Sequence, residues 1–273
     1  MTKLELINKS FVGVIAHISS DTKLESLEQY INTNKEIFDN FKGIIVAANY
    51  VDMPGLDKRF NALILRHHEI WLKYYPDVKF IDLDENRSHT FGTLDLDGAV
   101  FDYCKENDIE WLFKVNDDML FTPEFLEDEE LPEADFYYWN GIGYGGMTKY
   151  DYDIDRIAKE DFYPQTTQYF INTTKLPELH NKKGVDDAYN YTQGLENYNG
   201  RVWELIEGFT CEDFLKNAVT KNNLTKHHMI KPDTYIRLLN FVKANNIHDC
   251  SHKQLIIDGT VHLQWPNEKC III

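Results

Sequence analysis

The feature that most constrains the fold is a regular alternation, over the first half of the chain, of short apolar runs and longer amphipathic stretches. The apolar runs have the length and β-branched content of buried strands, and they are Phe11–Ile18, Gly43–Ala48, Val78–Leu83 and Glu110–Val115. The stretches between them repeat apolar residues at helical spacing, and they are Leu24–Phe38, Asn61–Tyr75 and Thr93–Asn107. Pro123–Leu126 is expected to open a further helix. Successive β/α units of this kind predict an α/β fold, with a mostly parallel sheet flanked by helices.

After Pro132 the regular alternation is lost, and the expected elements are separated by loops rich in Tyr, Asp and Gly. They are strands at Phe136–Trp139 and Gln168–Asn172, a further segment at Val202–Phe209, a helix near Glu212–Lys221 and a late strand around Thr260–Trp265. A chain of 273 residues fits one domain of this class. We therefore predict a single domain over residues 1–273, with a regular half at about 10–130 and an irregular half at about 131–273.

The charge of the chain restricts its partners. Asp and Glu number 45 against 28 Lys and Arg, a formal net charge of −17, which would repel nucleic acid and anionic membranes. The four cysteines are scattered without a C-x-x-C pair, so neither a zinc ribbon nor a disulfide framework is indicated. The longest apolar run, Phe11–Ile18, is too short to span a bilayer. We expect a cytoplasmic protein that binds neither nucleic acid nor membrane.

The segment Phe113–Met119 is the sharpest candidate for a functional site. Its apolar strand ends abruptly in two adjacent carboxylates, Asp117 and Asp118. Ligands of parallel sheets bind at the carboxyl ends of the strands, and neighbouring carboxylates repel each other unless a cation or donor is present. Oxygen ligands suit Mg²⁺ or Mn²⁺, which in turn would bridge a diphosphate. The alternative is a solvated turn before Pro123.

This segment resembles the metal-binding DxD motif of the GT-A glycosyltransferases, which follows the fourth strand of a nucleotide-binding half. Its counterpart here is Asn116-Asp117-Asp118, in which Asn116 replaces an Asp that in the family often contacts the ribose or the metal. The resemblance implies a GT-A-like, Rossmann-type fold with Mn²⁺ or Mg²⁺ held by Asp118, the firmest assignment, and by Asp117. It also implies a nucleotide-sugar donor, a UDP- or GDP-sugar, with Asn116 and Asp117 at the nucleotide.

A second resemblance is carried by Gly208–Phe214, which is similar to the acidic pair that opens a helix behind the acceptor site in this family. In inverting members the Asp of that pair is the catalytic base, which implies Asp213, with Glu212 next. The chemistry needs a carboxylate to take the acceptor's proton as its oxygen attacks the anomeric carbon. Ordinary helix capping is the alternative, because Thr210 is a good N-cap and acids favour the first turn.

In many family members a C-terminal His completes the metal or diphosphate shell, and His262 is placed to do so. His227 with His228, and His248 with His252, are competing histidines. The remaining nucleotide contacts that the resemblance implies are His17, Ser19, Asn49, Asp52, Arg87, His89 and Asp95. Arg87 or His89 would meet the diphosphate. The alternative for each residue is an ordinary polar position in a loop.

Together these features predict a metal-dependent glycosyltransferase that moves a sugar from a nucleotide diphosphate to the hydroxyl of a glycan or other acceptor, by inversion. Residues of about 10–130 would bind the donor, and those of about 131–273 the acceptor. A nucleotidyltransferase of similar fold is the first alternative, although His17–Asp21 lacks the Gly-rich basic loop that such enzymes carry after the first strand. The second is a non-catalytic carbohydrate-binding protein with Tyr137, Tyr138, Trp139 and Trp203 as sugar platforms.

Overall fold

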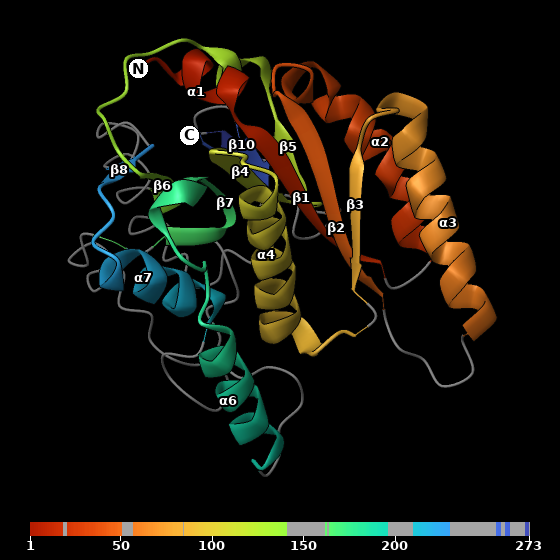
Figure 1. The fold of residues 1–273 in the computed structure, drawn as a ribbon. Helices are drawn as coiled ribbons and strands as arrows, with labels where there is room; N and C mark the ends of the chain where they lie inside the picture. The colour runs from red at the N-terminus through yellow and green to blue at the C-terminus, as the bar shows by residue number, and fades with distance from the viewer. Residues whose placement is uncertain are drawn as a thin grey trace.

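The computed structural model describes residues 1–18, 21–50, 57–83, 85–140, 162, 164–195, 210–229, 255–257, 260–262 and 271–272 (Figure 1). Its first part contains α1 (Lys3–Lys9), β1 (Phe11–Ile18), α2 (Asp21–Phe38), β2 (Gly43–Tyr50), α3 (Asp57–Tyr74), β3 (Lys79–Leu83), α4 (Ser88–Glu106) and β4 (Trp111–Asn116). Its second part contains β5 (Met119–Phe121), the 3₁₀ turns η1 (Pro123–Leu126) and η2 (Thr173–Lys175), β6 (Phe136–Asn140), β7 (Pro164–Asn172), α6 (Lys182–Gln193), α7 (Cys211–Lys221), β8 (Lys226–His228), β9 (Leu255–Ile257), β10 (Thr260–His262) and β11 (Ile271–Ile272).

One sheet of seven strands carries both parts of the chain, in the order β3-β2-β1-β4-β7-β6-β8. The four strands of the regular half are parallel to one another, as the alternation predicted. Strand β7 runs antiparallel to β4, with Trp111 opposite Asn172, and continues the sheet into the second half. The predicted fold class is therefore confirmed: a mostly parallel sheet flanked by helices.

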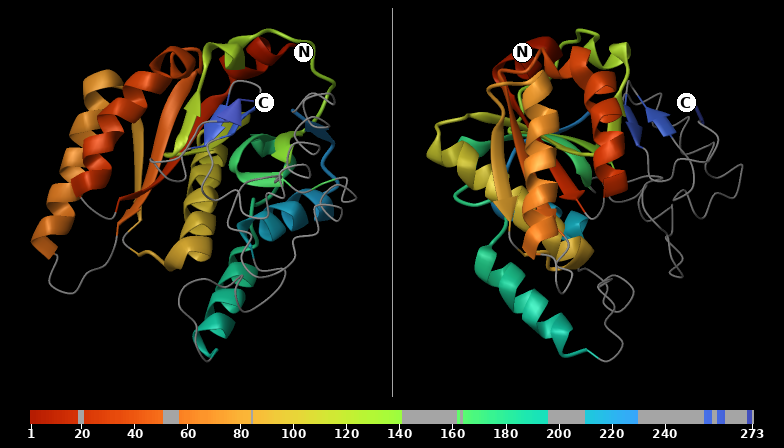
Figure 2. Two further views of the ribbon diagram at one scale, coloured as in Figure 1. Left: turned by 180° about the vertical axis from the view of Figure 1, so that it is seen from behind. Right: turned by 90° about the vertical axis from the view of Figure 1, so that its right-hand side faces the viewer.

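The helices cover the two faces of this sheet in separate layers. Along β1, Val12, Val14 and Ala16 point into the core formed with α2 and α3, whereas Ile15 points into the core formed with α4 and α7. This alternation follows from the strand repeat of two residues. Figure 2 shows α4 and α2 on opposite sides of the sheet. Each strand of the centre is thus buried on both faces, which explains its continuous apolar run.

The order of the strands creates a switch point between β1 and β4. From β1 the chain moves outward to β2 and β3, and then returns to add β4 on the other side of β1. Connections leave these two strands in opposite directions, which opens a crevice at their carboxyl ends. The end of β1 at Ile18 and the end of β4 at Asn116 consequently frame the place where a ligand is expected.

The segment behind the carboxylate motif differs from the expected helix. Met119–Phe121 forms β5, and Pro123–Leu126 makes one 3₁₀ turn that ends at Leu126 instead of an α-helix. Strand β5 joins a small second sheet of order β11-β9-β10-β5, in which β10 is antiparallel to β5. The apolar residues Met119, Phe121 and Phe125 are buried. Pairing with the distant strand β10 keeps the chain extended as far as Phe121, and the helix expected from Pro123 is only one 3₁₀ turn.

The helix α6 was not expected from the sequence. Only Val185, Ala188 and Thr192 of its residues are buried, so its apolar stripe is narrow. Its start is marked by Asn181, whose side chain accepts a hydrogen bond of 2.7 Å from the backbone of Gly184. The expected segment Val202–Phe209 lies outside the described residues.

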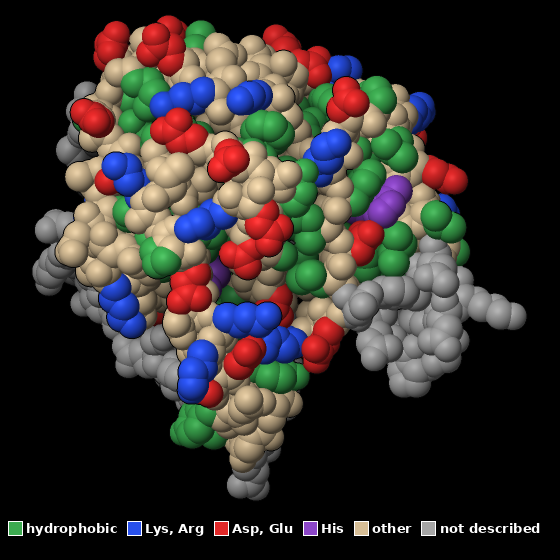
Figure 3. Space-filling model, viewed as in Figure 1, with side chains coloured by type: hydrophobic (Ala, Val, Ile, Leu, Met, Phe, Trp, Pro, Cys, Tyr) green, Lys and Arg blue, Asp and Glu red, His purple; other side chains and the backbone are tan. Residues whose placement is uncertain are grey.

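The described surface of Figure 3 mixes acidic and basic side chains, so that no broad basic area appears on this face. None of the helices among the described residues is long and apolar enough to cross a membrane.

Candidate functional site

A cavity of about 350 Å³ lies at the switch point of the sheet. It is lined by Ile15, Ala16, His17, Lys23, Asn49, Asn86, Gly92, Thr93, Leu96, Asn116, Asp117 and Asp118. These residues come from the carboxyl ends of β1, β2 and β4, from the turn after β4, from the first turn of α2, and from the first half of α4 and the loop before it. Five residues predicted to bind nucleotide or metal, His17, Asn49, Asn116, Asp117 and Asp118, therefore meet around one cavity.

The carboxylate motif forms the tight turn between β4 and β5. The backbone N–H of Asp117 donates to the Ile15 carbonyl over 3.0 Å, which ties the turn to β1. The Tyr30 hydroxyl donates to the Asn116 carbonyl over 3.3 Å from helix α2. All three residues of the motif are partly buried, so the turn is a wall of the cavity rather than a fully solvated loop.

The electrostatics of the turn are set by two neighbouring carboxylates and one lysine. Burial raises the pKa of Asp117 to about 6, while Lys23 lowers this pKa and the neighbouring Asp118 raises it. The Lys23 ammonium lies 3.7 Å from the Asp117 carboxylate. Sequence reasoning did not select Lys23. A lysine in the first turn of a helix is unfavourable beside the helix dipole, so its presence there is itself an indication of a functional position. Two carboxylates and one ammonium thus face the same cavity.

His262 is brought to the motif by strand pairing. In the antiparallel pair of β10 and β5, His262 is the partner of Met119, the residue that follows Asp118. The pairing places the backbone of His262, whose side chain lies outside the described part of the chain. Among the described side chains, no group of three His, Cys, Asp or Glu is arranged as a metal site. The competing pair His227 and His228 lies on β8, at the far edge of the seven-stranded sheet.

Side-chain amides and an imidazole form the wall of the cavity opposite the carboxylates. His17 Nδ1 is 2.6 Å from Asn49 Oδ1 and 3.2 Å from Asn86 Nδ2. Asn49 also donates to the Gly92 carbonyl over 3.4 Å. A Cβ atom at Gly92 would lie 2.5 Å from Asn86 Oδ1 and 2.9 Å from Asn49 Nδ2, so only glycine leaves room for both amides. This wall offers several hydrogen-bonding groups within a small space.

Other predicted nucleotide contacts are placed differently. The Arg87 guanidinium donates to Asp95, with Nε 2.8 Å from Oδ2, and to Asp186 over 2.6 Å. Its charge is therefore balanced by two carboxylates, and neither Arg87 nor Asp95 lines the cavity. His89 belongs to the first turn of α4, but its side chain is not described, and Ser19 and Asp52 lie outside the described residues.

The acidic pair opens helix α7. Thr210 and Asp213 form a capping box, in which Asp213 Oδ2 accepts from the Thr210 backbone over 3.1 Å and from its hydroxyl over 2.8 Å. Glu212 accepts a hydrogen bond of 2.8 Å from the hydroxyl of Thr166, on β7. The residues lining the cavity do not include either carboxylate. Asp213 thus has a structural task, which leaves the assignment of a base between the two as a prediction.

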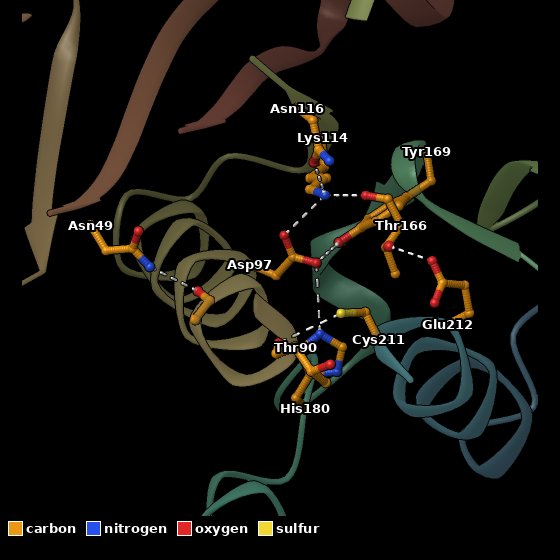
Figure 4. Close-up of polar contacts among 11 residues, drawn as sticks. Asn49, Thr90, Asp97, Lys114, Asn116, Thr166, Tyr169, His180, Cys211 and Glu212 are labelled. Atoms are coloured by element: carbon orange, nitrogen blue, oxygen red, sulfur yellow. Dashed lines mark hydrogen bonds and ion pairs between the residues drawn. The ribbon is translucent and has the colours of Figure 1, made fainter. Parts of the chain in front are cut away.

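A buried polar cluster joins this pair to the carboxylate motif (Figure 4). At its centre, Lys114 on β4 contacts Asp97 on α4, and both side chains are fully buried. The Lys114 ammonium also donates to Asn116 Oδ1 and to the carbonyl of Thr166. Because the Thr166 hydroxyl donates to Glu212, Thr166 links the motif to α7 through two different groups, its backbone carbonyl and its hydroxyl. Sequence reasoning missed Asp97 because an acid on a helix reads as solvent-exposed.

No protein-family model matches the chain, and no curated protein matches its sequence. Among solved structures, the galactosyltransferase LgtC, in complex with donor and acceptor sugar analogues, is similar over 83% of this chain and 78% of its own, with 10% identity and a TM-score of 0.42. An active-site mutant of LgtC is similar over 82% of this chain and 76% of its own, with 10% identity and a TM-score of 0.42. A nucleoside-diphosphate-sugar pyrophosphorylase from Vibrio cholerae RC9 is similar over 84% of this chain and 99% of its own, with 12% identity and a TM-score of 0.38. Likenesses of this degree carry no argument about activity, which rests on the residues of the site.

Proposed function

We propose that this protein is a metal-dependent glycosyltransferase that uses a nucleotide-sugar donor. The observation that carries the proposal is the meeting of Asp117 and Asp118 with Lys23 and the amide wall around one cavity at the switch point of the sheet. A nucleotide diphosphate needs hydrogen-bonding groups for its base and ribose. It also needs a positive charge beside its phosphates. The amide wall is suited to the first, and the carboxylate turn with a bound cation is suited to the second.

The residues of the turn fit a divalent cation. Asp117 and Asp118 offer carboxylate oxygens, which are the ligands that Mg²⁺ and Mn²⁺ prefer. Without a cation, burial makes the charged form of Asp117 unfavourable, as its raised pKa shows. A divalent cation held by these residues would neutralise the charge of the departing diphosphate. The strand pairing of His262 with Met119 is compatible with a third ligand from β10.

The reaction would be a displacement at the anomeric carbon. The acceptor oxygen forms a bond to this carbon, the bond from the carbon to the phosphate oxygen breaks, and the diphosphate leaves with the electron pair. The proton of the acceptor hydroxyl passes to a carboxylate, for which Asp213 and Glu212 are the candidates. A single displacement of this kind inverts the configuration of the sugar. Lys23 would hold the phosphates electrostatically from helix α2.

The first test is thermal unfolding of the protein with a panel of UDP- and GDP-sugars, in the presence of Mn²⁺ or EDTA. We expect one donor to raise the melting temperature of the wild type with Mn²⁺ only, because a ligand that binds the native state stabilises it. Asp118→Asn should remove this rise. Asp102→Asn, which neutralises an exposed carboxylate of α4 away from the cavity, should keep it. A donor that stabilises Asp118→Asn as well as the wild type would contradict the proposed metal site.

Product analysis separates the alternatives. A glycosyltransferase releases a nucleoside diphosphate from the stabilising donor, transferring the sugar to an acceptor or to water. A nucleotidyltransferase instead releases pyrophosphate from a nucleoside triphosphate and a sugar 1-phosphate. A carbohydrate-binding protein gives neither product. Release of pyrophosphate, or of nothing, would overturn the proposed reaction even if a nucleotide binds.

A further inference from the structure

Lys114 is an unusual residue for the place that it occupies. It lies in the central strand β4, two residues before Asn116, and its side chain is fully buried. Lysine is almost never fully buried unless it is paired. The strand repeat of two residues brings the side chains of Lys114 and Asn116 to the same face of the sheet, where α4 and β7 cover them (Figure 4).

Three oxygens surround the Lys114 ammonium, of which two accept hydrogen bonds from it and one, from Asp97, forms an ion pair. Asn116 Oδ1 is 2.6 Å away, the Thr166 carbonyl is a second hydrogen-bond acceptor, and Asp97 Oδ1 is 3.3 Å away. Asp97 is held in turn, because the Tyr169 hydroxyl donates to its other oxygen over 3.3 Å. His180 Nε2 lies 3.9 Å from that same oxygen. The ammonium is therefore fixed from the sheet and from the helix.

This arrangement decides which way the Asn116 amide is turned. A lysine ammonium has three donors and no acceptor, so the amide must present its oxygen, and not its nitrogen, to Lys114. With the oxygen turned to Lys114, the –NH₂ of Asn116 is turned away from the ammonium, and this group can only donate. Because Asn116 lines the cavity, its –NH₂ is a candidate donor to a ligand there.

We propose that Lys114 is a positioning residue, which orients Asn116 so that its amide nitrogen donates a hydrogen bond to an acceptor oxygen of the bound nucleotide. The cation then belongs to Asp117 and Asp118 without Asn116. The inference rests on the proposed function, and it accounts for an amide where a carboxylate stands in the motif that this turn resembles. A carboxylate beside Lys114 could not donate at all.

A matched pair of variants isolates the hydrogen bond. Lys114→Met and Lys114→Gln both remove the charge opposite Asp97 and have similar length, but only glutamine keeps a donor for Asn116 Oδ1. We would measure the affinity of UDP and of GDP in the presence of saturating Mn²⁺ by calorimetry. In Lys114→Met the affinity of the nucleotide that binds the wild type should fall about tenfold, the scale of one lost hydrogen bond. Lys114→Gln should retain most of it.

Asn116→Asp is the direct test, and it changes a partly buried side chain at the cavity rather than one in the core. It removes the donor and adds an oxygen ligand. Nucleotide affinity with Mn²⁺ should fall about tenfold, while the affinity for Mn²⁺ alone, followed by the electron paramagnetic resonance of the free ion, should stay equal or rise. If either Lys114 variant does not fold, this variant decides alone.

The outcomes separate the inference from the proposed function. If neither UDP nor GDP binds the wild type with Mn²⁺, the proposed function has failed. If one of them binds, but Asn116→Asp binds it as tightly as the wild type, the inference is wrong and the function stands. Equal losses of nucleotide affinity in Lys114→Met and Lys114→Gln would show that Lys114 acts only as the charge partner of Asp97. This result also overturns the inference.

Discussion

At the scale of single residues, the space in the cavity depends on Gly92, which has no side chain. This residue lies in the second turn of α4, between the amides of Asn49 and Asn86. A Cβ atom there would come within 2.5 Å of Asn86 Oδ1, closer than real Cβ contacts are found. Helical glycine is otherwise unfavourable by roughly 1 kcal/mol relative to alanine, so its presence here indicates a demand for space.

We expect Gly92→Ala to lower the affinity for the nucleotide while leaving the fold intact, because it displaces the amides without opening the core. Gly98→Ala is the matched control, since it lies on the same helix with nothing within 4 Å of its Cβ position. Gly98→Ala should gain about 0.5–1 kcal/mol of unfolding free energy and bind as the wild type does. Thermal shift with nucleotide and Mn²⁺ measures the binding. Equal binding by both alanine variants would show that the amide wall takes no part.

At the scale of the elements, strand β1 and helix α4 approach each other closely at Gly13. A Cβ atom at this position would be 2.7 Å from Val100 Cγ1 and 2.8 Å from Leu112 Cδ1. Val100 belongs to α4 and Leu112 to β4, and both are fully buried. The contact therefore sets how near α4 lies to the sheet, and with it the positions of Asp97 and Gly92 relative to the ends of the strands.

Gly13→Val should destabilise the protein by roughly 1–3 kcal/mol, because added volume in a packed interior forces strain. The stiff side chain of Val100 leaves little room to adjust. Urea unfolding at neutral pH measures the loss, with Gly98→Ala again as the control that keeps the same helix free of new contacts. A Gly13→Val protein as stable as the wild type would show that the gap between strand and helix is wider than described.

At the scale of the whole molecule, two histidines near opposite edges of the seven-stranded sheet have lowered pKa values, the buried His67 of α3, next to Phe80 of β3, and the partly buried His228 of β8. At one edge, the Trp71 indole donates to His67 Nε2 over 3.2 Å, so this nitrogen must be free of a proton. Burial lowers the pKa of His67 to about 4, with His68 lowering it further and Asp82 raising it. At the other edge, on β8, burial and then His227 lower the pKa of His228 to about 4.

Acidification should therefore destabilise the protein below pH 6.5, the ordinary pKa of histidine in an unfolded chain. Between this pH and about 4 the unfolded chain binds protons that the folded one excludes, so stability is complete above 6.5 and is lost as the pH falls. Each histidine contributes up to about 1.4 kcal/mol per pH unit.

Urea unfolding at several pH values measures this slope. His67→Gln, which removes one titrating group, should give a shallower decline between pH 6.5 and 4 than the wild type, even if its stability at neutral pH is lower. An unchanged slope in this variant would show that His67 is not excluded from protonation in the folded state.

Several features could be predicted from the sequence because they depend on residues that are neighbours along the chain. The apolar runs of β1, β2 and β4 were predicted to within a few residues, since strands buried on both faces are mostly apolar. Capping of α7 by Thr210 was likewise predicted as the ordinary alternative to a catalytic role, and the structure adds the return hydrogen bond to Asp213. The place of Asn116, Asp117 and Asp118 followed from the rule that ligands meet the carboxyl ends of parallel strands.

Other features were decided by tertiary structure alone. Residues far apart in the chain meet in Lys114 with Asp97, in Lys23 with Asp117 and in the backbone of His262 with Met119. The spacing of apolar residues along the sequence does not predict such pairs, because it indicates which face of an element a residue occupies and not which segment packs on that face. The helix expected from Pro123 is a single 3₁₀ turn, and it follows the strand β5, which pairs with the distant strand β10. The sequence by itself determined the layers of this protein and the edge where its site lies, whereas packing between distant segments decided which side chains the site contains and which way they are turned.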